Sequence, residues 1–228
     1  YGQTLVQWPL QACAAPLRIG MIDTAVADAH AAFRDRRIET FRAGRGSKRS
    51  AAAHGTAVAS ILVGNPAGGQ AGLLSAAELF AADVFETRGQ QTSTQAMLIA
   101  AGLDWLLEVG VDAINISLTG PDSRVLAETL RRVIAAGVPV AAAAGNQGAQ
   151  APPQYPAAYP EVLAVTAVDR HARLYGRANR GPHVELAAPG VGVWVADPGG
   201  SGRFGLTCKA SAEHTIHVPR GSLDDLQH

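Results

Sequence analysis

Three polar side chains in this sequence follow or begin apolar segments and could take part in acid–base or electrophilic chemistry. His54 begins a run of small and apolar residues, Asp23 ends an apolar segment near the N-terminus, and Asn146 follows a run of alanines. A rigidly held imidazole can shuttle protons, a carboxylate can orient it, and an amide can donate a hydrogen bond to an oxyanion. Each of these residues alone is also typical of a structural role. The interpretation therefore depends on whether the fold brings them together.

The elements expected to position these residues are strands that alternate with helices. Apolar runs bounded by turn residues predict strands, whereas a 3.6-residue period predicts helices. The predicted strands are 17–22, 78–84, 111–118, 138–144, 162–168 and 184–188, and the predicted helices are 51–62, 93–109 and 123–136, with residues 28–50 as a loop containing one helical turn. We therefore predict a single α/β domain whose mostly parallel sheet has helices on both faces.

In a parallel sheet, ligand chemistry gathers at the carboxyl ends of the strands. This rule places Asp23, the segment 117–120 and the pair Gly145–Asn146 at one edge, and His54 begins the helix after the first strand. The first strand is not followed by Gly-x-Gly-x-x-Gly, and the chain contains no phosphate-binding Gly-x4-Gly-Lys-Ser/Thr motif. Dinucleotide and nucleotide binding therefore lose their main sequence support.

The composition excludes several other classes of protein. The chain has 228 residues, of which 47% are hydrophobic and 17% charged, and its formal net charge is zero. A neutral chain without a basic block is a poor partner for nucleic acid. The longest apolar run, 138–144, is too short to span a membrane. The two cysteines, Cys13 and Cys208, do not form a disulfide framework, and whether they pair with each other stays open.

Several short motifs occur in the order in which one protease family has them. They are Ile22-Asp23-Thr24, His54-Gly55-Thr56-Ala57-Val58-Ala59, Asn115-Ile116-Ser117-Leu118, Ala143-Ala144-Gly145-Asn146 and Ala187-Ala188-Pro189-Gly190. Over residues 8–204 the chain thus resembles the subtilisin-like (subtilase) serine proteases. This resemblance implies an endopeptidase that hydrolyses peptide bonds through an Asp–His–nucleophile triad and an asparagine oxyanion hole.

The resemblance also implies roles for individual residues. Asp23 would orient His54, His54 would transfer the nucleophile's proton to the leaving amine, and Asn146 would donate to the oxyanion. An extended peptide substrate would add as a strand beside the enzyme, with small residues forming an undemanding pocket wall. The implied substrate-binding residues are Ser117, Leu118, Thr119, Gly120, Ala143 and Gly145.

Cofactors and partners follow from the same resemblance. Members of the family often bind calcium, but no run of carboxylates identifies a calcium site here, so no cofactor or metal is predicted. The expected partner is an extended peptide or protein, and the family also implies an inhibitory pro-segment that this chain does not contain. Family members are mostly exported, so export is the expected localisation.

The resemblance breaks at the nucleophile. The family has Gly-Thr-Ser-x-Ala-x-Pro at the start of a long apolar helix, whereas the nearest match here is Leu206-Thr207-Cys208-Lys209-Ala210-Ser211-Ala212. Cys208 stands at the serine position, and three alternatives follow. Cys208 could be a thiol nucleophile activated by His54, the protein could have lost catalysis, or residues 206–228 could be a non-native end that arose by truncation, frameshift or a vector-encoded tail. Ser211 as nucleophile is a minor variant.

Residues 213–217, which are polar or β-branched, and Pro219 do not suit the expected apolar helix. We therefore predict an incomplete peptidase domain, 1–205, followed by an atypical tail, 206–228, with the central nucleophile helix missing. Two rival functions follow: a non-catalytic peptide-binding domain that needs no nucleophile, and a thiol acyltransferase acting through Cys208.

Overall fold

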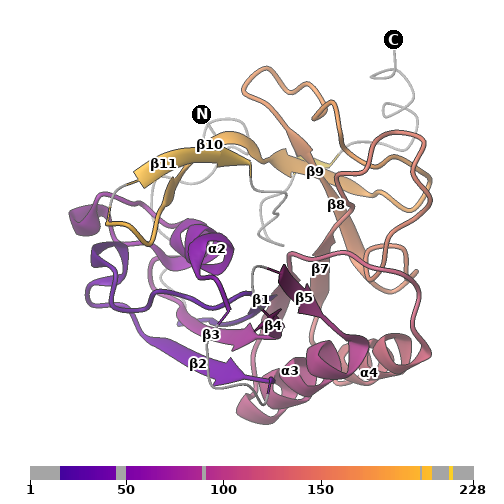
Figure 1. The fold of residues 1–228 in the computed structure, drawn as a ribbon, viewed down its shortest axis with the longest axis horizontal. Helices are drawn as coiled ribbons and strands as arrows, with labels where there is room; N and C mark the ends of the chain where they lie inside the picture. The colour runs from indigo at the N-terminus through magenta and orange to yellow at the C-terminus, as the bar shows by residue number, and fades with distance from the viewer. Residues whose placement is uncertain (1–15, 45–49, 89–90, 201, 207–215, 218–228) are drawn as a thin grey trace.

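A mostly parallel sheet forms the centre of the fold (Figure 1). The structure is a computed structural model and describes residues 16–44, 50–88, 91–200, 202–206 and 216–217. The 8 strands of the main sheet lie in the order β12-β9-β8-β7-β6-β1-β3-β2, and only β12 runs antiparallel to its neighbour. These strands are β1 (Arg18–Asp23), β2 (Ile38–Arg42), β3 (Glu78–Asp83), β6 (Ala113–Ile116), β7 (Val140–Ala143), β8 (Leu163–Val168), β9 (Leu186–Pro189) and β12 (Ile216–His217).

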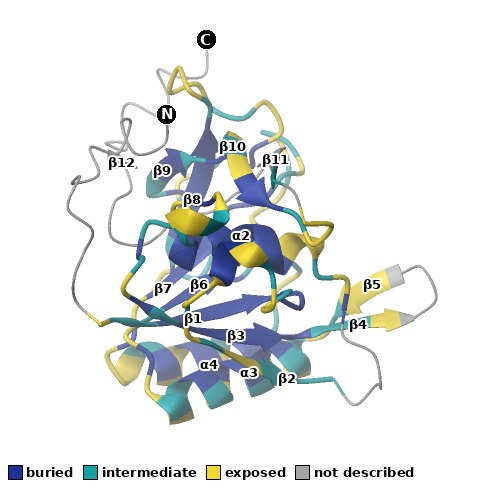
Figure 2. Ribbon diagram, turned by 90° about the vertical axis from the view of Figure 1, so that its left-hand side faces the viewer, coloured by how far each residue is buried: buried dark blue, intermediate teal, exposed yellow. Residues whose placement is uncertain are grey.

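The central strands are apolar on both faces because both faces are covered. Along β1, Met21 packs into one hydrophobic cluster and the next residue, Ile22, packs into the other. Strand β3 alternates in the same way, with Leu79 on one side and Phe80 on the other. Figure 2 shows the resulting buried sheet between helices. The predicted fold class, an α/β domain with a mostly parallel sheet, is confirmed.

The helices lie on opposite faces of this sheet. Helices α3 (Ala96–Val109) and α4 (Arg124–Ala135) cover one face, and α2 (Ala53–Val63) covers the other (Figures 1 and 2). Gly110 ends α3 with a φ of 73°, as its glycine predicts. Ser123 begins α4, since its side chain accepts a hydrogen bond from the Leu126 N–H at 3.4 Å.

Two sequence-based assignments were wrong in part. The segment 28–50 does contain the expected helical turn, the 3-10 helix η1 (Ala31–Phe33), but it also contains edge strand β2. The charged residues of β2 hide this strand, whose Phe41 stacks on Trp105 at 5.1 Å. The predicted helix 93–109 begins only at Ala96, because the Thr- and Ser-rich residues before it form β5 (Gln91–Thr94), which pairs with β4 (Phe85–Arg88).

A second antiparallel pair covers the outer side of α2. Strands β10 (Val191–Ala196) and β11 (Gly202–Leu206) form this ribbon (Figure 1). The Ser60 hydroxyl on α2 accepts a hydrogen bond from the Ala196 N–H at 3.0 Å and donates to the Ala57 carbonyl at 2.7 Å. The small residues of α2 thus allow a close neighbour. A short second 3-10 helix, η2 (Pro66–Gly68), follows α2.

The C-terminal end of the chain is described only in part. Strand β11 ends at the predicted domain boundary, and β12 lies inside the predicted tail, where Ile216 pairs with Ala187 of β9. The prediction that the nucleophile helix is missing concerns residues 207–215 and 218–228, which lie outside the described residues. Within the described ranges, no helix has both the length and the apolar character needed to cross a membrane.

Candidate active site

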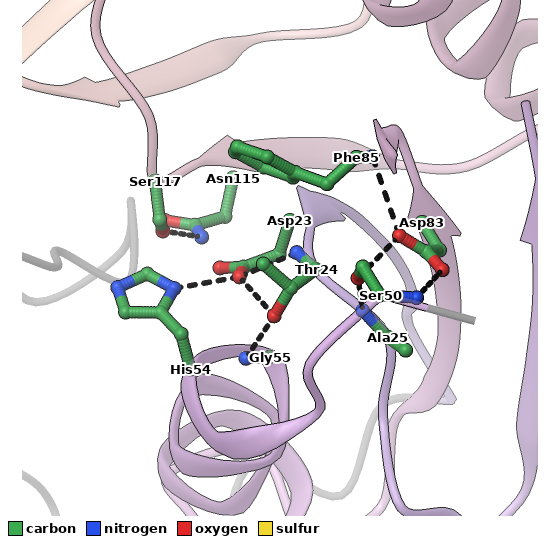
Figure 3. Close-up of polar contacts among 10 residues, drawn as sticks. All are labelled: Asp23, Thr24, Ala25, Ser50, His54, Gly55, Asp83, Phe85, Asn115 and Ser117. Atoms are coloured by element: carbon green, nitrogen blue, oxygen red, sulfur yellow. Dashed lines mark hydrogen bonds and ion pairs between the residues drawn. The ribbon is translucent and has the colours of Figure 1, made fainter. Parts of the chain in front are cut away.

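Asp23 lies at the carboxyl end of β1, where the neighbouring strands β3 and β6 also end. Its side chain is 1% exposed, and Oδ1 accepts hydrogen bonds from the Thr24 N–H at 2.7 Å and the Thr24 hydroxyl at 3.3 Å. Nδ1 of His54 lies 2.6 Å from the same oxygen (Figure 3). A carboxylate removed from water is stabilised by such hydrogen bonds. The sequence prediction placed Asp23 and His54 together, and the structure does so.

His54 is presented by the first turn of α2. Its side chain is 48% exposed, whereas the Asp23 carboxylate beside it is buried. One ring nitrogen therefore contacts a buried acid while the ring keeps a solvent-facing side. This is the arrangement required of a base that receives a proton from an incoming group.

Gly55 permits the close approach between α2 and the end of β1. A Cβ at this position would lie 2.3 Å from the Thr24 carbonyl oxygen and 2.5 Å from that of Ala25. The Gly55 N–H donates to the Thr24 hydroxyl at 2.9 Å (Figure 3). The Gly after His54 is therefore needed for contact with the backbone that carries Asp23.

A second buried carboxylate braces this region. Asp83 at the end of β3 is 5% exposed and accepts hydrogen bonds from the Ser50 hydroxyl at 2.7 Å, the Ser50 N–H at 3.1 Å and the Phe85 N–H at 3.3 Å. The Ser50 hydroxyl in turn accepts from the Ala25 N–H at 2.8 Å (Figure 3). Ser50 thus connects the segment after Asp23 to the neighbouring strand. Sequence reasoning assigned no role to Ser50 or Asp83.

A cavity of about 310 Å³ adjoins this network. Side chains from the segment after Asp23 and from β2 and β3 surround it, and Asp83 and Arg42 supply its charges. The residues lining it are Thr24, Ala25, Val26, Thr40, Phe41, Arg42, Ala81 and Asp83.

The predicted substrate-binding segment follows β6, the next strand along the sheet. Asn115 is buried, and its side-chain amide donates to the Ser117 hydroxyl at 2.7 Å (Figure 3). Leu118 is buried, whereas Ser117 and Thr119 are partly exposed. Gly120 pairs with Tyr155, its N–H donating to the Tyr155 carbonyl at 2.8 Å and its carbonyl accepting from the Tyr155 N–H at 3.0 Å.

Asn146 follows β7, which lies beside β6. Because Ile116 pairs with Ala142, Ser117 and Ala143 come at the same level of the sheet. Ala143 and Gly145 are buried, and Asn146 is partly buried. The turn that carries Asn146 is tied to buried Asn179, which sequence reasoning missed because it lies on a distant connection without a motif of its own.

Asp23 thus ends β1, and Ser117 and Asn146 come after β6 and β7. These three strands are parallel neighbours, so the residues lie at one edge of the sheet, as the sequence predicted. Cys208 lies outside the described residues, as does Cys13, so the structure places neither. Within the described residues, no group of three or more His, Cys, Asp or Glu side chains could hold a metal ion.

A titratable group with a large pKa shift lies near the start of α4. Burial raises the pKa of Tyr159 to about 12; the hydrogen bond and charge of Asp122 add to this shift, and the contact with the Ser123 backbone opposes it. The Tyr159 hydroxyl donates to Asp122 Oδ1 at 2.8 Å and accepts from the Ser123 N–H at 3.1 Å. This hydroxyl holds the segment after Gly120 against the 150–162 connection.

Comparisons with known proteins show which family has this sequence and fold. Subtilisin DY from Bacillus licheniformis is 32% identical over 189 residues, covering 81% of this chain and 68% of that protein. Subtilisin E from Bacillus subtilis is 35% identical over 153 residues, covering 65% of this chain and only 39% of that protein. The solved self-cleaved protease domain of PatA matches with a TM-score of 0.75 and 28% identity, over 84% of this chain and 74% of that one. A family model described as "Subtilase family" matches residues 16–218. Since that match spans most of the sequence, the chain belongs to the subtilase family of serine proteases.

Proposed function

We propose that this protein is an endopeptidase that cleaves extended peptides, with Asp23 and His54 as the acid–base pair and Asn146 as an oxyanion donor. The observation that carries the proposal is the 2.6 Å contact between a buried carboxylate and a half-exposed imidazole at the carboxyl edge of the sheet. A merely structural histidine does not need an exposed face next to a buried acid. Membership of the family supports the same reading.

In this proposal Asp23 sets the state of the imidazole. When Nδ1–H of neutral His54 donates to Asp23, the lone pair lies on the other ring nitrogen, which can accept the nucleophile's proton. The imidazolium that forms is stabilised by the buried carboxylate. It then gives the proton to the leaving amine, which departs and leaves an acyl-enzyme. Water adds to the acyl carbon as His54 takes one of its protons; the bond between acyl group and nucleophile then breaks, the proton returns to the nucleophile and the acid product leaves.

Asn146 acts on the carbonyl oxygen of the substrate. As the nucleophile adds, negative charge develops on this oxygen, and a preorganised amide N–H stabilises it more strongly than it stabilises the ground state. The position of Asn146, three residues after the end of β7, supports this role, because β7 lies next to the strand that leads to Ser117.

The substrate backbone would lie along residues 117–119. Successive residues of an extended strand direct their polar backbone groups to opposite sides. Since Gly120 directs its N–H and carbonyl to Tyr155, those of Thr119 are aimed at the opposite side, where a peptide could add. Gly120 would then support this edge through its pairing with Tyr155, and Ala143 and Gly145 would form a wall of small residues beside the peptide.

The nucleophile is the part of the proposal that rests on sequence alone. Cys208 is the nearest sequence match to the family's nucleophilic serine, so a thiol acyl-enzyme is the second candidate. In a peptidase, the acyl group passes to water, whereas in a thiol acyltransferase it passes to an amine. A domain that binds peptides without cleaving them is the third candidate.

One experiment distinguishes these candidates. The chain is incubated with a fluorogenic peptide carrying a small residue before the scissile bond, and separately with a fluorophosphonate and with iodoacetamide, followed by peptide mapping. His54→Ala removes the base, and His171→Ala, at an exposed turn, is the matched control.

Peptide cleavage that is lost in His54→Ala and kept in His171→Ala supports the proposal, and the labelled peptide identifies the nucleophile. Fast, His54-dependent alkylation of Cys208 with acyl transfer to added amines supports the thiol acyltransferase instead. Peptide binding without cleavage or labelling contradicts the endopeptidase and supports the binding domain.

A further inference from the structure

Asn179 lies on the connection between β8 and β9, far along the chain from Asn146, and it is 1% exposed. Its backbone N–H donates to the Gly145 carbonyl at 3.0 Å. Its side-chain Oδ1 accepts from the Gln147 N–H at 2.7 Å. The residues on both sides of Asn146 are thus bonded to the same buried asparagine.

Gly145 shows how close this approach is. Its φ is 113°, a conformation that favours glycine, and a Cβ there would lie 2.9 to 3.2 Å from the side-chain amide atoms of Asn179. The Asn179 amide therefore fills the space that a side chain at position 145 would need. The backbone turn before Asn146 is shaped around Asn179.

Neighbouring contacts hold Asn179 itself in place. The Gly148 N–H donates to the Arg177 carbonyl at 2.9 Å, and the Ala178 N–H donates to the Tyr175 carbonyl at 2.8 Å. Segments 145–148 and 177–179 thus run beside each other with three connecting hydrogen bonds. This arrangement makes the turn after β7 part of a two-segment unit and not an isolated loop.

We infer that Asn179 is a positioning residue for the oxyanion donor: it fixes the Gly145–Gln147 backbone and thereby aims the Asn146 amide at the developing oxyanion. This inference rests on the proposed function of Asn146. Oxyanion stabilisation depends on a donor held in place before the reaction, and a displacement of about 1 Å can cost on the order of 10²-fold in rate. Loss of the Asn179 side chain leaves the Gln147 N–H without its acceptor and frees the turn.

The kinetic test is a double-mutant cycle of Asn179→Ala and Asn146→Ala. We expect Asn179→Ala to lower kcat by roughly 10- to 100-fold with KM nearly unchanged, and to have almost no further effect when Asn146 is already alanine. A matched control is Gln154→Ala, since Gln154 is a buried amide whose side chain bonds the Gln147 side chain and the Pro152 and Pro153 carbonyls, and not the Gly145–Gln147 backbone. An equal fall in kcat in both backgrounds, or none in either, overturns the inference.

A second measurement works without turnover and so separates this inference from the proposed function. The chain contains four asparagines, 65, 115, 146 and 179, so asparagine-selective ¹⁵N labelling gives four side-chain amide pairs. Asn146→Ala assigns the Asn146 pair, and its heteronuclear NOE reports how rigidly that amide is held. We expect Asn179→Ala to lower this NOE, and Gln154→Ala to leave it unchanged.

Asn179→Asp guards against a variant that fails to fold, because it has the same shape and keeps the Oδ1 acceptor for the Gln147 N–H. It should keep Asn146 rigid. If the Asn146 amide is as mobile in Asn179→Asp as in Asn179→Ala, which lacks the side-chain amide, the inference is overturned. If the wild type is inactive while Asn146 is rigid and depends on Asn179, the proposed function fails but the positioning role stands.

Discussion

The two halves of the candidate site are held in different ways. Asp23 and His54 lie at the ends of regular elements, and a glycine brings the backbones of those elements into direct contact. Asn146 lies on a turn whose shape depends on a side chain from a distant connection. In the proposed mechanism, the base and its acid must keep one short hydrogen bond, which a strand and a helix can fix. The proposed oxyanion donor must match a charge that develops only during the reaction, and its aim depends on the supporting side chain.

The largest effect on kcat should come from the pair Asp23 and His54, which is held by a regular strand and helix. Asp23→Asn should lower kcat on the order of 10⁴-fold, because an amide at this position favours the wrong tautomer of His54 and does not stabilise the imidazolium. The assay is cleavage of the fluorogenic peptide. Asp104→Asn is the control, since Asp104 forms only an exposed ion pair with Arg132 on α4. A fall of less than tenfold would mean that the Asp23–His54 contact is structural.

Asn146, which is held on a turn, should contribute less to the rate. Asn146→Ala removes one donor and should lower kcat by about 10²–10³-fold with little change in KM. Gln150→Ala, at an exposed position on the same connection, is the control. A rise in KM with unchanged kcat would show that Asn146 binds the ground state, and the comparison between the two halves would then fail.

The free energy of unfolding should fall most when the hydrogen bonds beside Asp23 and His54 are removed. Ser50→Ala leaves the Ala25 N–H without its acceptor and removes a donor from buried Asp83, so the free energy of unfolding should fall by about 1–3 kcal/mol. Urea denaturation measures it. Ser93→Ala, on an exposed strand position, serves as the control. If Ser50→Ala unfolds at the same urea concentration as the wild type, water replaces the hydroxyl and the network does not stabilise the region around Asp23 and His54.

The smallest effect concerns stability at alkaline pH, on the side proposed to bind substrate. Tyr159 has a pKa of about 12 in the folded chain and near 10 when unfolded, so the folded state holds the proton more tightly. The stabilisation is complete below pH 10 and is lost as the pH rises from 10 towards 12. Tyr159→Phe should therefore show a weaker dependence of stability on pH in this window. An unchanged slope would contradict the role given to the hydroxyl.

The sequence allowed the prediction of those parts that contiguous residues determine. Asp23 and His54 each lie in a short motif, and the apolar runs beside them predict the strand and the helix that carry them. Asn179 and Ser50 act through partners that are far away in the chain, and neither their type nor their neighbours indicate this. Strand β2 was missed because it is an edge strand with only two apolar contacts, Ile38 and Phe41, and its charged residues are typical of a loop.

The position of β1 in the sheet has a consequence for how the chain folds. Its two neighbours come much later in the sequence, since Arg18 pairs with Glu78 and Ile19 pairs with Ala113. Both loops must close before the strand that carries Asp23 has a partner on each side, and such long closures cost entropy before any contact compensates for it. Folding should therefore be slow compared with that of helical proteins of this size. A chain emerging from the ribosome has no complete Asp23–His54 environment until β6 has been synthesised.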